Sequence, residues 1–338
     1  MPAKHRDGRA LGQGACEGRG DLFTISFVAP AGTGSRRFGN YEILSVLGKG
    51  GMGEVYRAKV VAGPRKGWIV ALKRLPPALA ENPEYLDRFT TEADLSKLLD
   101  HPHIVKVLEA GVTEDTYFIA MEFVDGTDLA RILRRCRRGG IQLPVDFAIY
   151  LAKVLLEALA YAHAAVGASG APLHIVHCDV SPSNLFISRT GEVKLGDFGV
   201  ARVRNVGAED SVVEGKVHYL SPEAIAGRPT TATDLWAAAV TLYELLTLQR
   251  PFVGTTPEQV LEAIRHRRYR PIRELRPELA PAIAQVIDRA FAEEPSARFQ
   301  TAGEFAKTLG GLFDERIGNP MAIAAMVRGL FGAGRAKQ

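Results

Sequence analysis

The periodicity of the sequence changes near residues 125–128 (DGTD), and this change restricts the folds open to the chain. Before it lie short β-rich runs separated by Gly and Pro, with one helical segment at 83–99. After it the chain is mainly helical, and its first long apolar helix spans 144–165. We therefore predict an α+β fold of two lobes, a small β-rich lobe with one helix and a larger α-helical lobe, joined near residues 122–126.

Composition and charge narrow the class of protein. Of 338 residues, 46% are hydrophobic and 24% are charged, which is typical of a globular protein and excludes wholesale disorder. The net charge of +4 is too small to indicate a nucleic-acid partner. The three cysteines are odd in number and widely spaced, which argues against disulfides and a zinc site and favours the cytoplasm. No apolar run reaches the roughly 18 residues that span a membrane.

The chain divides into three parts. Residues 1–37 are rich in Gly and basic side chains, so we predict a flexible extension. Residues 38–313 form the folded domain, with its lobes at 38–124 and 125–313. The tail at 314–338 contains a short amphipathic helix that begins at Asn and Pro. Its apolar stripe should dock on the large lobe or on a partner chain, and consists of Ile323, Met326, Val327, Leu330 and Phe331.

A glycine motif lies between the first two predicted strands. The run GKGGMGEV fits GxGxxGxV, with glycines at Gly48, Gly50 and Gly53. Glycines let a backbone approach a phosphate and adopt positive φ. Because no helix follows the motif, it argues against a dinucleotide fold and against a Walker loop.

A lysine and a glutamate on neighbouring elements form a candidate ion pair. Lys73 ends the strand-like run VALK, and Glu92 lies on the following helix. A lone strand lysine is most often a solvated surface residue, so the interpretation depends on Glu92. Such a pair would hold the ammonium over the α- and β-phosphates of a nucleotide.

Two later motifs supply oxygen ligands and a base. HCDVSPSN contains Asp179 and Asn184, and GDFGV contains Asp197. Carboxylate and amide oxygens are the ligands that Mg²⁺ prefers, and a carboxylate can accept the proton of a hydroxyl. These groups indicate a site for a metal-bound triphosphate.

Taken in this order, the motifs resemble those of bacterial eukaryotic-like (Hanks-type) serine/threonine protein kinases, over residues 41 to about 313. The segment SPE at 221–223 stands where the family has APE, and DLWAAAV and ARFQTAGEF resemble two later motifs. The resemblance implies a bilobal protein-kinase-like fold. It also implies an ion pair between Glu223 and Arg298.

The resemblance also implies roles for individual residues. Asp179 would accept or orient the proton of the substrate hydroxyl, and Asn184 and Asp197 would bind Mg²⁺, or Mn²⁺ in its place. Met121 would be the gatekeeper beside adenine, and the backbone of Glu122 and Val124 the hinge. The remaining implied ATP contacts, besides the phosphate anchor Lys73 and its partner Glu92, are Leu47, Gly48, Gly50, Gly53, Val55 and Ala71. His177 would support the loop structurally.

The catalytic loop departs from the family pattern at two charged positions. Cys178 replaces an arginine that usually receives a phosphate on the following segment, where Ser211 is a candidate phosphosite. Ser181 replaces a lysine that usually neutralises the transferring phosphoryl group, and Lys216 stands where a threonine is usual. We hypothesise that Ser181 and Lys216 are an exchanged pair that keeps one positive charge near Asp179. The alternative is neutral drift in a weakened enzyme.

The predicted function is therefore a protein kinase that transfers the γ-phosphoryl group of Mg–ATP to Ser or Thr hydroxyls of protein substrates. We expect it to act in bacterial-type signal transduction, with autophosphorylation. The alternative is a pseudokinase scaffold that binds partners, with or without nucleotide, and does not transfer the phosphoryl group. The Arg-rich segment 131–138 is either a solvated helix face or, like the tail helix, a docking site for a partner.

Overall fold

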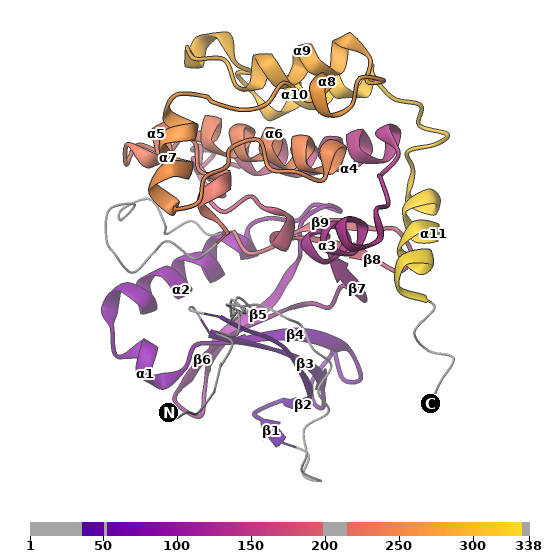
Figure 1. Cartoon of the computed structure of the whole chain (residues 1–338). Coiled ribbons are helices and arrows are strands. Elements are labelled where there is room, and N and C mark those ends of the chain that lie inside the picture. Colours follow the sequence, from indigo (N-terminus) through magenta and orange to yellow (C-terminus); the bar gives the residue numbers. More distant parts are fainter. Residues whose placement is uncertain (1–35, 51–52, 199–214, 333–338) are drawn as a thin grey trace, which may run out of the picture.

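The computed structural model describes residues 36–50, 53–198 and 215–332, which form two lobes (Figure 1). The small lobe consists of a curved sheet with one long helix, α2 (Pro83–Lys97), and the larger lobe is built from helices. This arrangement confirms the predicted α+β bilobal fold. The predicted N-terminal extension, apart from its last two residues, lies outside the described part of the chain.

The sheet of the small lobe has six antiparallel strands in the order β1-β2-β3-β4-β6-β5. Its first strand includes Arg36 and Arg37, so the folded part begins slightly before residue 38. A short helix, α1 (Pro77–Ala80), precedes α2. The strands are β1 (Arg36–Phe38), β2 (Tyr41–Gly50), β3 (Gly53–Val60), β4 (Ile69–Arg74), β5 (Val107–Thr113) and β6 (Thr116–Glu122).

Side chains of the small lobe are buried on both faces of this sheet, because neighbouring residues of a strand point to opposite faces. On one face Leu72 packs with Phe38 and Phe118. On the other, Phe89 and Ala93 of α2 pack with Ile119 and Met121 of β6. Asn82 caps the start of α2 by accepting a hydrogen bond from the Glu84 backbone N–H at 2.9 Å. The packing of α2 fixes which of its side chains face the sheet.

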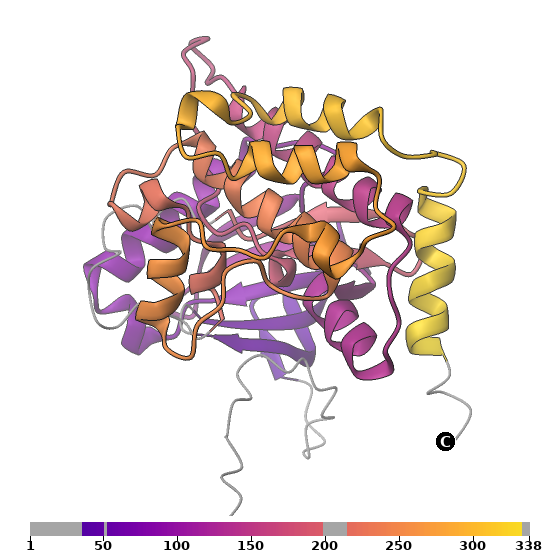
Figure 2. The ribbon, with the colours of Figure 1, turned by 45° about the horizontal axis from the view of Figure 1, so that its top comes forward.

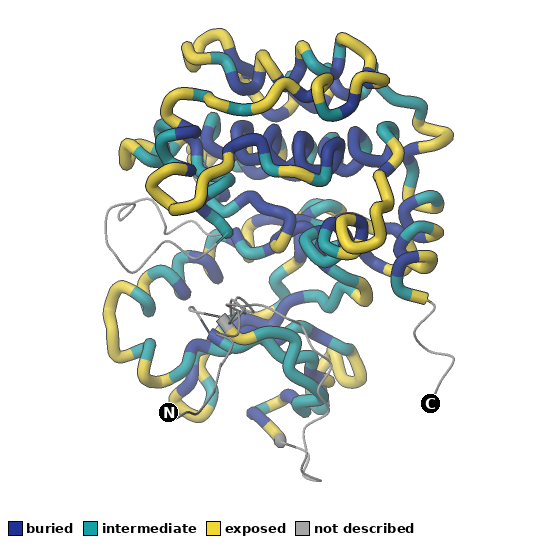
Figure 3. The backbone as a smooth tube through the Cα atoms, in the orientation of Figure 1, coloured by how far each residue is buried: buried dark blue, intermediate teal, exposed yellow. Residues whose placement is uncertain are grey.

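The large lobe is organised around α4 (Val145–His163) and α6 (Thr231–Thr247). Every residue from Thr233 to Thr247 is buried, and Figure 3 shows α6 as an almost continuous buried segment between outer helices. A helix that is buried on all sides must lie in the core of its lobe. Among the other helices of the lobe, α8 and α9 pack on α6, and α10 packs on α4. These helices are α3 (Leu129–Gly139), α5 (Pro222–Ile225), α7 (Pro257–Arg265), α8 (Ile272–Leu275), α9 (Pro281–Ala290) and α10 (Ala302–Gly310).

A small three-stranded sheet lies near the hinge, and short 3₁₀ turns complete the large lobe. The sheet order is β7-β8-β9, from β7 (Gly126–Asp128), β8 (Leu185–Ser188) and β9 (Val193–Leu195). The 3₁₀ turns are η1 (Pro182–Asn184), η3 (Val217–Tyr219) and η4 (Pro295–Ala297). The hairpin of β8 and β9 separates the two predicted metal-binding residues and brings the ends of the hairpin together.

The tail helix α11 (Pro320–Phe331) docks on the large lobe beside α3, as Figures 1 and 2 show. Ile323, Val327 and Leu330 are buried in the core of that lobe. The Arg135 guanidinium of α3 lies 5.7 Å from the centre of the Phe331 ring. The structure thus favours docking on the large lobe over docking on a partner chain. No helix within the described ranges has the length and apolar character needed to cross a bilayer.

We expect α11 to contribute to the stability of the large lobe. The Ile323→Ala variant should lower the free energy of unfolding by about 2–5 kcal/mol, because a fully buried side chain is replaced by a cavity. Met321 lies on the same helix with 82% of its surface exposed, so Met321→Ala should change it by less than about 0.5 kcal/mol. Urea titrations measure both values, and equal effects of the two substitutions would contradict the docking.

Candidate active site

The predicted ion pair between the small-lobe sheet and α2 is present. Lys73 lies in β4, opposite Val55 of β3 and Ile119 of β6. Its Nζ is 2.5 Å from Oε1 of Glu92 and 3.5 Å from Oδ1 of Asp197. The side chains of Lys73 and Glu92 are 10% and 8% exposed, so each charge depends on the other for compensation.

The electrostatics of this group favour a charged lysine. Burial alone would lower the pKa of the Lys73 ammonium, but Glu92 and Asp197 raise it above its ordinary value. Burial alone would raise the pKa of Asp197, but Lys73 and Lys216 hold it below its ordinary value. Burial raises the pKa of Glu92, and Lys73 opposes that rise. The result is an ammonium flanked by two carboxylates, and Asp197 is ionised at neutral pH.

The catalytic-loop residues converge on the carboxylate of Asp179. Nδ2 of Asn184 donates to the backbone oxygen of Asp179 at 2.8 Å and to its Oδ2 at 3.1 Å. The same Oδ2 accepts a hydrogen bond from Nζ of Lys216 at 2.5 Å. Pro182 starts the 3₁₀ turn η1 that joins Asp179 to Asn184. Since the amide nitrogen of Asn184 is engaged, its amide oxygen is the atom that can bind a metal.

Asp197 is placed beside Asn184 by backbone geometry. The N–H of Gly196 donates to the backbone oxygen of Asn184 at 2.9 Å. Asp197 itself has φ of 55°, a left-handed conformation that non-glycine residues rarely adopt and that concentrates at functional sites. The next residue in the predicted motif, Phe198, is buried with its ring 4.6 Å from that of His177. The candidate phosphosite Ser211 lies outside the described residues.

Sequence reasoning assigned no role to Asp234, yet its carboxylate anchors the catalytic loop. Its Oδ2 accepts from the backbone N–H of His177 at 2.8 Å, and its Oδ1 accepts from that of Cys178 at 2.9 Å. Nε2 of His163 lies 2.8 Å from Oδ2. Cys178 has φ of 60°, so these bonds hold a strained backbone next to Asp179. The signal was available in the motif DLWAAAV, which begins at Asp234.

The ring of His177 has the structural contacts expected of it. Nε2 lies 3.1 Å from the backbone oxygen of Gly196, and the N–H of Asp179 donates to Nδ1 at 3.2 Å. Burial lowers the pKa of His177, although nearby carboxylates oppose this. The neutral ring therefore ties the catalytic loop to the segment before Asp197.

The glycine motif forms the turn between β2 and β3, of which the structure describes Gly48, Gly50 and Gly53. Gly53 has φ of 133°, and a Cβ there would lie 2.3 Å from the backbone oxygen of Arg74. Gly48 pairs with Val55, and a Cβ there would meet no atom within 4 Å. Gly53 is therefore required by the packing of the sheet, whereas the space beside Gly48 would allow a ligand to approach the strand.

Apolar residues from both lobes lie beside the hinge. Ala71 pairs with Met121 across β4 and β6, and both pack in one cluster with Val124. Phe186 of β8 joins this cluster from the large lobe. Sequence reasoning missed Phe186, whose only signal was its place two residues after Asn184. The half-buried Leu47 of β2 and Val55 of β3 lie on the strands that flank the glycine turn.

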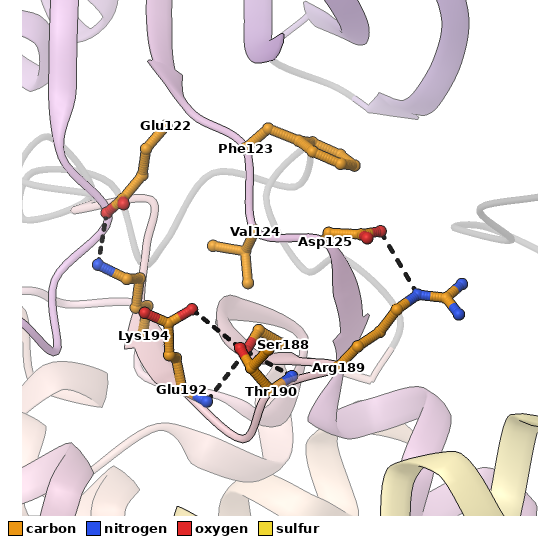
Figure 4. A pocket seen from close by; sticks show the side chains of 9 residues that line it. All are labelled: Glu122, Phe123, Val124, Asp125, Ser188, Arg189, Thr190, Glu192 and Lys194. Carbon is orange, nitrogen blue, oxygen red and sulfur yellow. Dashed lines mark hydrogen bonds and ion pairs between the residues drawn. The ribbon is translucent and has the colours of Figure 1, made fainter. Parts of the chain in front are cut away.

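The side chain of the hinge residue Glu122 is held by groups from both lobes. Its Oε1 accepts from the backbone N–H of Lys106 at 2.7 Å and from Nζ of Lys194 in β9 at 2.9 Å. Figure 4 shows this ion pair at the edge of a pocket of about 180 Å³ between the hinge and the β8–β9 turn. Arg189 and Asp125 pair across the same pocket at 3.5 Å. Lys73, Asp179 and Asp197 do not line this pocket.

The ion pair implied between Glu223 and Arg298 is also present, at 3.1 Å. The site thus unites the buried ammonium of Lys73, three carboxylates and an amide between the lobes, and a second ammonium contacts Asp179. This is a set of groups that can hold a metal-bound polyphosphate and orient a hydroxyl.

The sequence profile described as "Protein kinase domain" matches residues 41–308. The chain belongs to the protein kinase family.

Curated relatives of this kinase include proteins named for two acceptor classes. It is 36% identical over 306 residues to the protein named tyrosine-protein kinase MasK of Myxococcus xanthus, covering 88% of this chain and 47% of MasK. It is 33% identical over 287 residues to the serine/threonine-protein kinase PrkC of Bacillus subtilis, covering 83% of this chain and 42% of PrkC. The chain therefore spans less than half the length of these relatives.

A solved kinase domain has the same fold. The crystal structure of the Mycobacterium tuberculosis PknI kinase domain superposes with a TM-score of 0.61 at 29% identity, covering 82% of this kinase and 98% of that chain. Membership of the family implies the use of ATP and a divalent metal ion, with a protein as phosphoryl acceptor.

The exchange hypothesis finds unequal support in the contacts of its two residues. The Lys216 ammonium lies at Asp179, as the hypothesis requires. The Ser181 hydroxyl instead lies 2.9 Å from the hydroxyl of Ser183, in a buried position. The positive charge is therefore near the predicted base, while the hydroxyl faces its own loop. The roles of both residues stay predictions.

We expect the loss of the Asp234 carboxylate to affect activity and stability together. In Asp234→Asn an NH₂ group would face backbone N–H donors, which should lower the free energy of unfolding by about 3 kcal/mol. Phosphorylation should fall by more than tenfold because the loop carrying Asp179 loses its anchor. Asp100, whose side chain is 74% exposed, provides the control Asp100→Asn, which should change neither quantity. Wild-type activity in Asp234→Asn would contradict the anchoring role.

Proposed function

We propose that this kinase is an active enzyme that transfers the γ-phosphoryl group of Mg–ATP to Ser or Thr hydroxyls of proteins, including its own. The observation that carries the proposal is the coexistence of two charge clusters. Lys73 pairs with Glu92 and reaches Asp197, while Asp179 contacts both Asn184 and Lys216. A scaffold without catalysis has no need of both. We place the activity in the cytoplasm, for which the few and widely spaced cysteines are the support.

In the proposed mechanism Asp179 accepts the proton of the acceptor hydroxyl. The hydroxyl oxygen forms a bond to the γ-phosphorus, the bond from that phosphorus to the β–γ bridging oxygen breaks, and ADP leaves. Lys73 holds the α- and β-phosphates, and its ion pair with Glu92 fixes its position. Asn184 and Asp197 would hold Mg²⁺, or Mn²⁺, which neutralises phosphate charge when bound.

Two features of the small lobe and the hinge support a nucleotide site. The open space beside Gly48 supports an approach of the phosphates to the glycine turn. The apolar cluster of Ala71, Met121, Val124 and Phe186 supports adenine binding next to the hinge. We assign the further adenine contacts to Leu47 and Val55, and the hydrogen bonds to the backbone of Glu122 and Val124.

Lys216 is proposed to supply the charge that the catalytic loop lacks. Its ammonium at Asp179 would lie beside the transferring group, where positive charge lowers the barrier. We expect Lys216→Thr to reduce kcat by about 10²–10³. If Ser181→Lys restores part of this loss in the double variant, the two positions exchange one function. A double variant no better than Lys216→Thr would refute the exchange, and kcat values from a four-member cycle decide.

Ser and Thr are the proposed acceptors because the segment HYLSPE around Tyr219 resembles that subgroup. The loop between Asp179 and Asn184 also lacks the arginine found in tyrosine kinases. The similarity to the relative named a tyrosine kinase favours tyrosine as a second acceptor. Phosphoamino-acid analysis of the autophosphorylated chain separates the two, and phosphotyrosine alone would overturn the Ser/Thr proposal.

The most direct test of catalysis compares wild type with Asp179→Asn, using ATP labelled at the γ-phosphate. The wild type should label itself and protein substrates, and Asp179→Asn should lose at least about 10² of this rate, since the amide cannot accept the proton. Chelation of divalent metal should abolish labelling, and Mg²⁺ and Mn²⁺ additions show which ion restores it. Equal labelling by both proteins would refute the assignment, and no labelling by either would support the pseudokinase alternative.

A further inference from the structure

An arginine-rich surface lies beside the segment that reaches the catalytic base. Lys216, whose Nζ contacts Asp179, directly follows Gly215, and η3 begins at the next residue. A Cβ at Gly215 would lie 3.7 Å from an Nη of Arg250. The Arg250 guanidinium also lies 5.9 Å from the centre of the Tyr219 ring. Arg250 therefore flanks the chain segment that an acceptor must approach.

A second arginine meets Arg250 at a buried carboxylate. Glu244 of α6 is 2% exposed and accepts a hydrogen bond from the Tyr219 hydroxyl. Arg137, from the last turn of α3, donates to Glu244 and also to the backbone oxygen of Leu248, at 2.6 Å from Nε. Nε of Arg250 lies 3.9 Å from the same carboxylate. One carboxylate thus faces two guanidinium groups.

This arrangement leaves a surplus of positive charge near solvent. The long separation and the 34% exposure of Arg250 leave much of its guanidinium available to a bound segment, and Arg137 is 38% exposed. His218 adds no charge at neutral pH, because burial and Arg250 lower its pKa. The neighbouring helix α7 carries Glu262, which already pairs with Arg265 and His266.

Resting on the proposed function, we propose that Arg250, with Arg137 behind it, selects protein substrates that carry an acidic side chain close to the acceptor hydroxyl. Lys216 contacts Asp179, and the preceding residue, Gly215, lies beside Arg250. The path from Asp179 to Arg250 through these two residues is no longer than about five residues of extended chain. A carboxylate within that distance on a substrate can approach Arg250 while its hydroxyl lies at Asp179.

Paired peptides test the selectivity. Each pair has the same acceptor Ser with Glu or Gln at one of the five positions on either side, and the readout is the ratio of kcat/KM for Glu over Gln. For wild type we expect a ratio of about two to five at the best position, as for a partly exposed charge pair. The ratio should decrease between about 0.02 M and about 0.5 M salt, because exposed charges are screened.

Two variants distinguish a specific effect of Arg250 from the effect of removing any positive charge at the surface. Arg250→Gln should bring the ratio toward one, whereas Arg270→Gln should keep the wild-type ratio, since Arg270 is 57% exposed and pairs with Glu274. Thermal unfolding checks that Arg250→Gln is folded, and Arg137 and Tyr219 still satisfy Glu244 in it. A wild-type ratio of one at every position, or an undiminished ratio in Arg250→Gln, overturns the selectivity while leaving the kinase activity established. Failure of wild type to phosphorylate any peptide or itself overturns the proposed function as well.

Discussion

The active site depends on one buried carboxylate, that of Asp234. Its two oxygens bind the backbone N–H groups of His177 and Cys178, and the ring of His163 lies against it. Asp234 belongs to α6, which is enclosed by the rest of the large lobe, so close packing fixes its position. The left-handed backbone at Cys178 is thereby held by the centre of the lobe, and Asp179 is oriented from there.

Negative and positive side chains alternate across the site from the small lobe to the large lobe. Glu92 on α2 pairs with Lys73 of the sheet, which reaches Asp197 at the end of the β8–β9 hairpin. On the other side Lys216 neutralises Asp179. Each buried charge has an opposite charge beside it, and the attraction within these pairs offsets the cost of removing the ionised groups from water. In the proposed reaction the same ammonium groups would face the phosphates of ATP.

The sequence predicted the two-lobed fold because the fold depends on local patterns. Strand and helix periodicities gave the two lobes, and Pro83 marked the start of α2 correctly. Lys73 and Glu92 were brought together as expected, although they are 19 residues apart. Motif spacing alone could not show which residues support the site from elsewhere. Asp234 and Phe186 act through contacts between distant segments. Phe186 has no distinctive local pattern, and the motif that begins at Asp234 does not show which segment its carboxylate contacts.

The contacts of Ser181 and Arg250 could not be read from the sequence for a related reason. The hydroxyl of Ser181 contacts that of Ser183 in the same loop. Motif spacing does not determine which of several nearby groups a hydroxyl contacts. In the sequence Arg250 is one residue of a loop after α6. Its proposed role depends on its position beside Gly215 and Glu244, which only the structure shows. Likewise the apolar stripe of α11 predicted burial, but only the fold shows that α3 lies against it.

In the proposed reaction Lys216 supplies charge to phosphoryl transfer rather than to nucleotide binding. Measuring the ATP dissociation constant and the single-turnover transfer rate of wild type and Lys216→Thr under the same conditions separates these two roles. We expect a dissociation constant within about threefold of wild type and a transfer rate lower by about 10² or more. An unchanged transfer rate, or a loss confined to ATP affinity, would contradict the role of Lys216 in transfer.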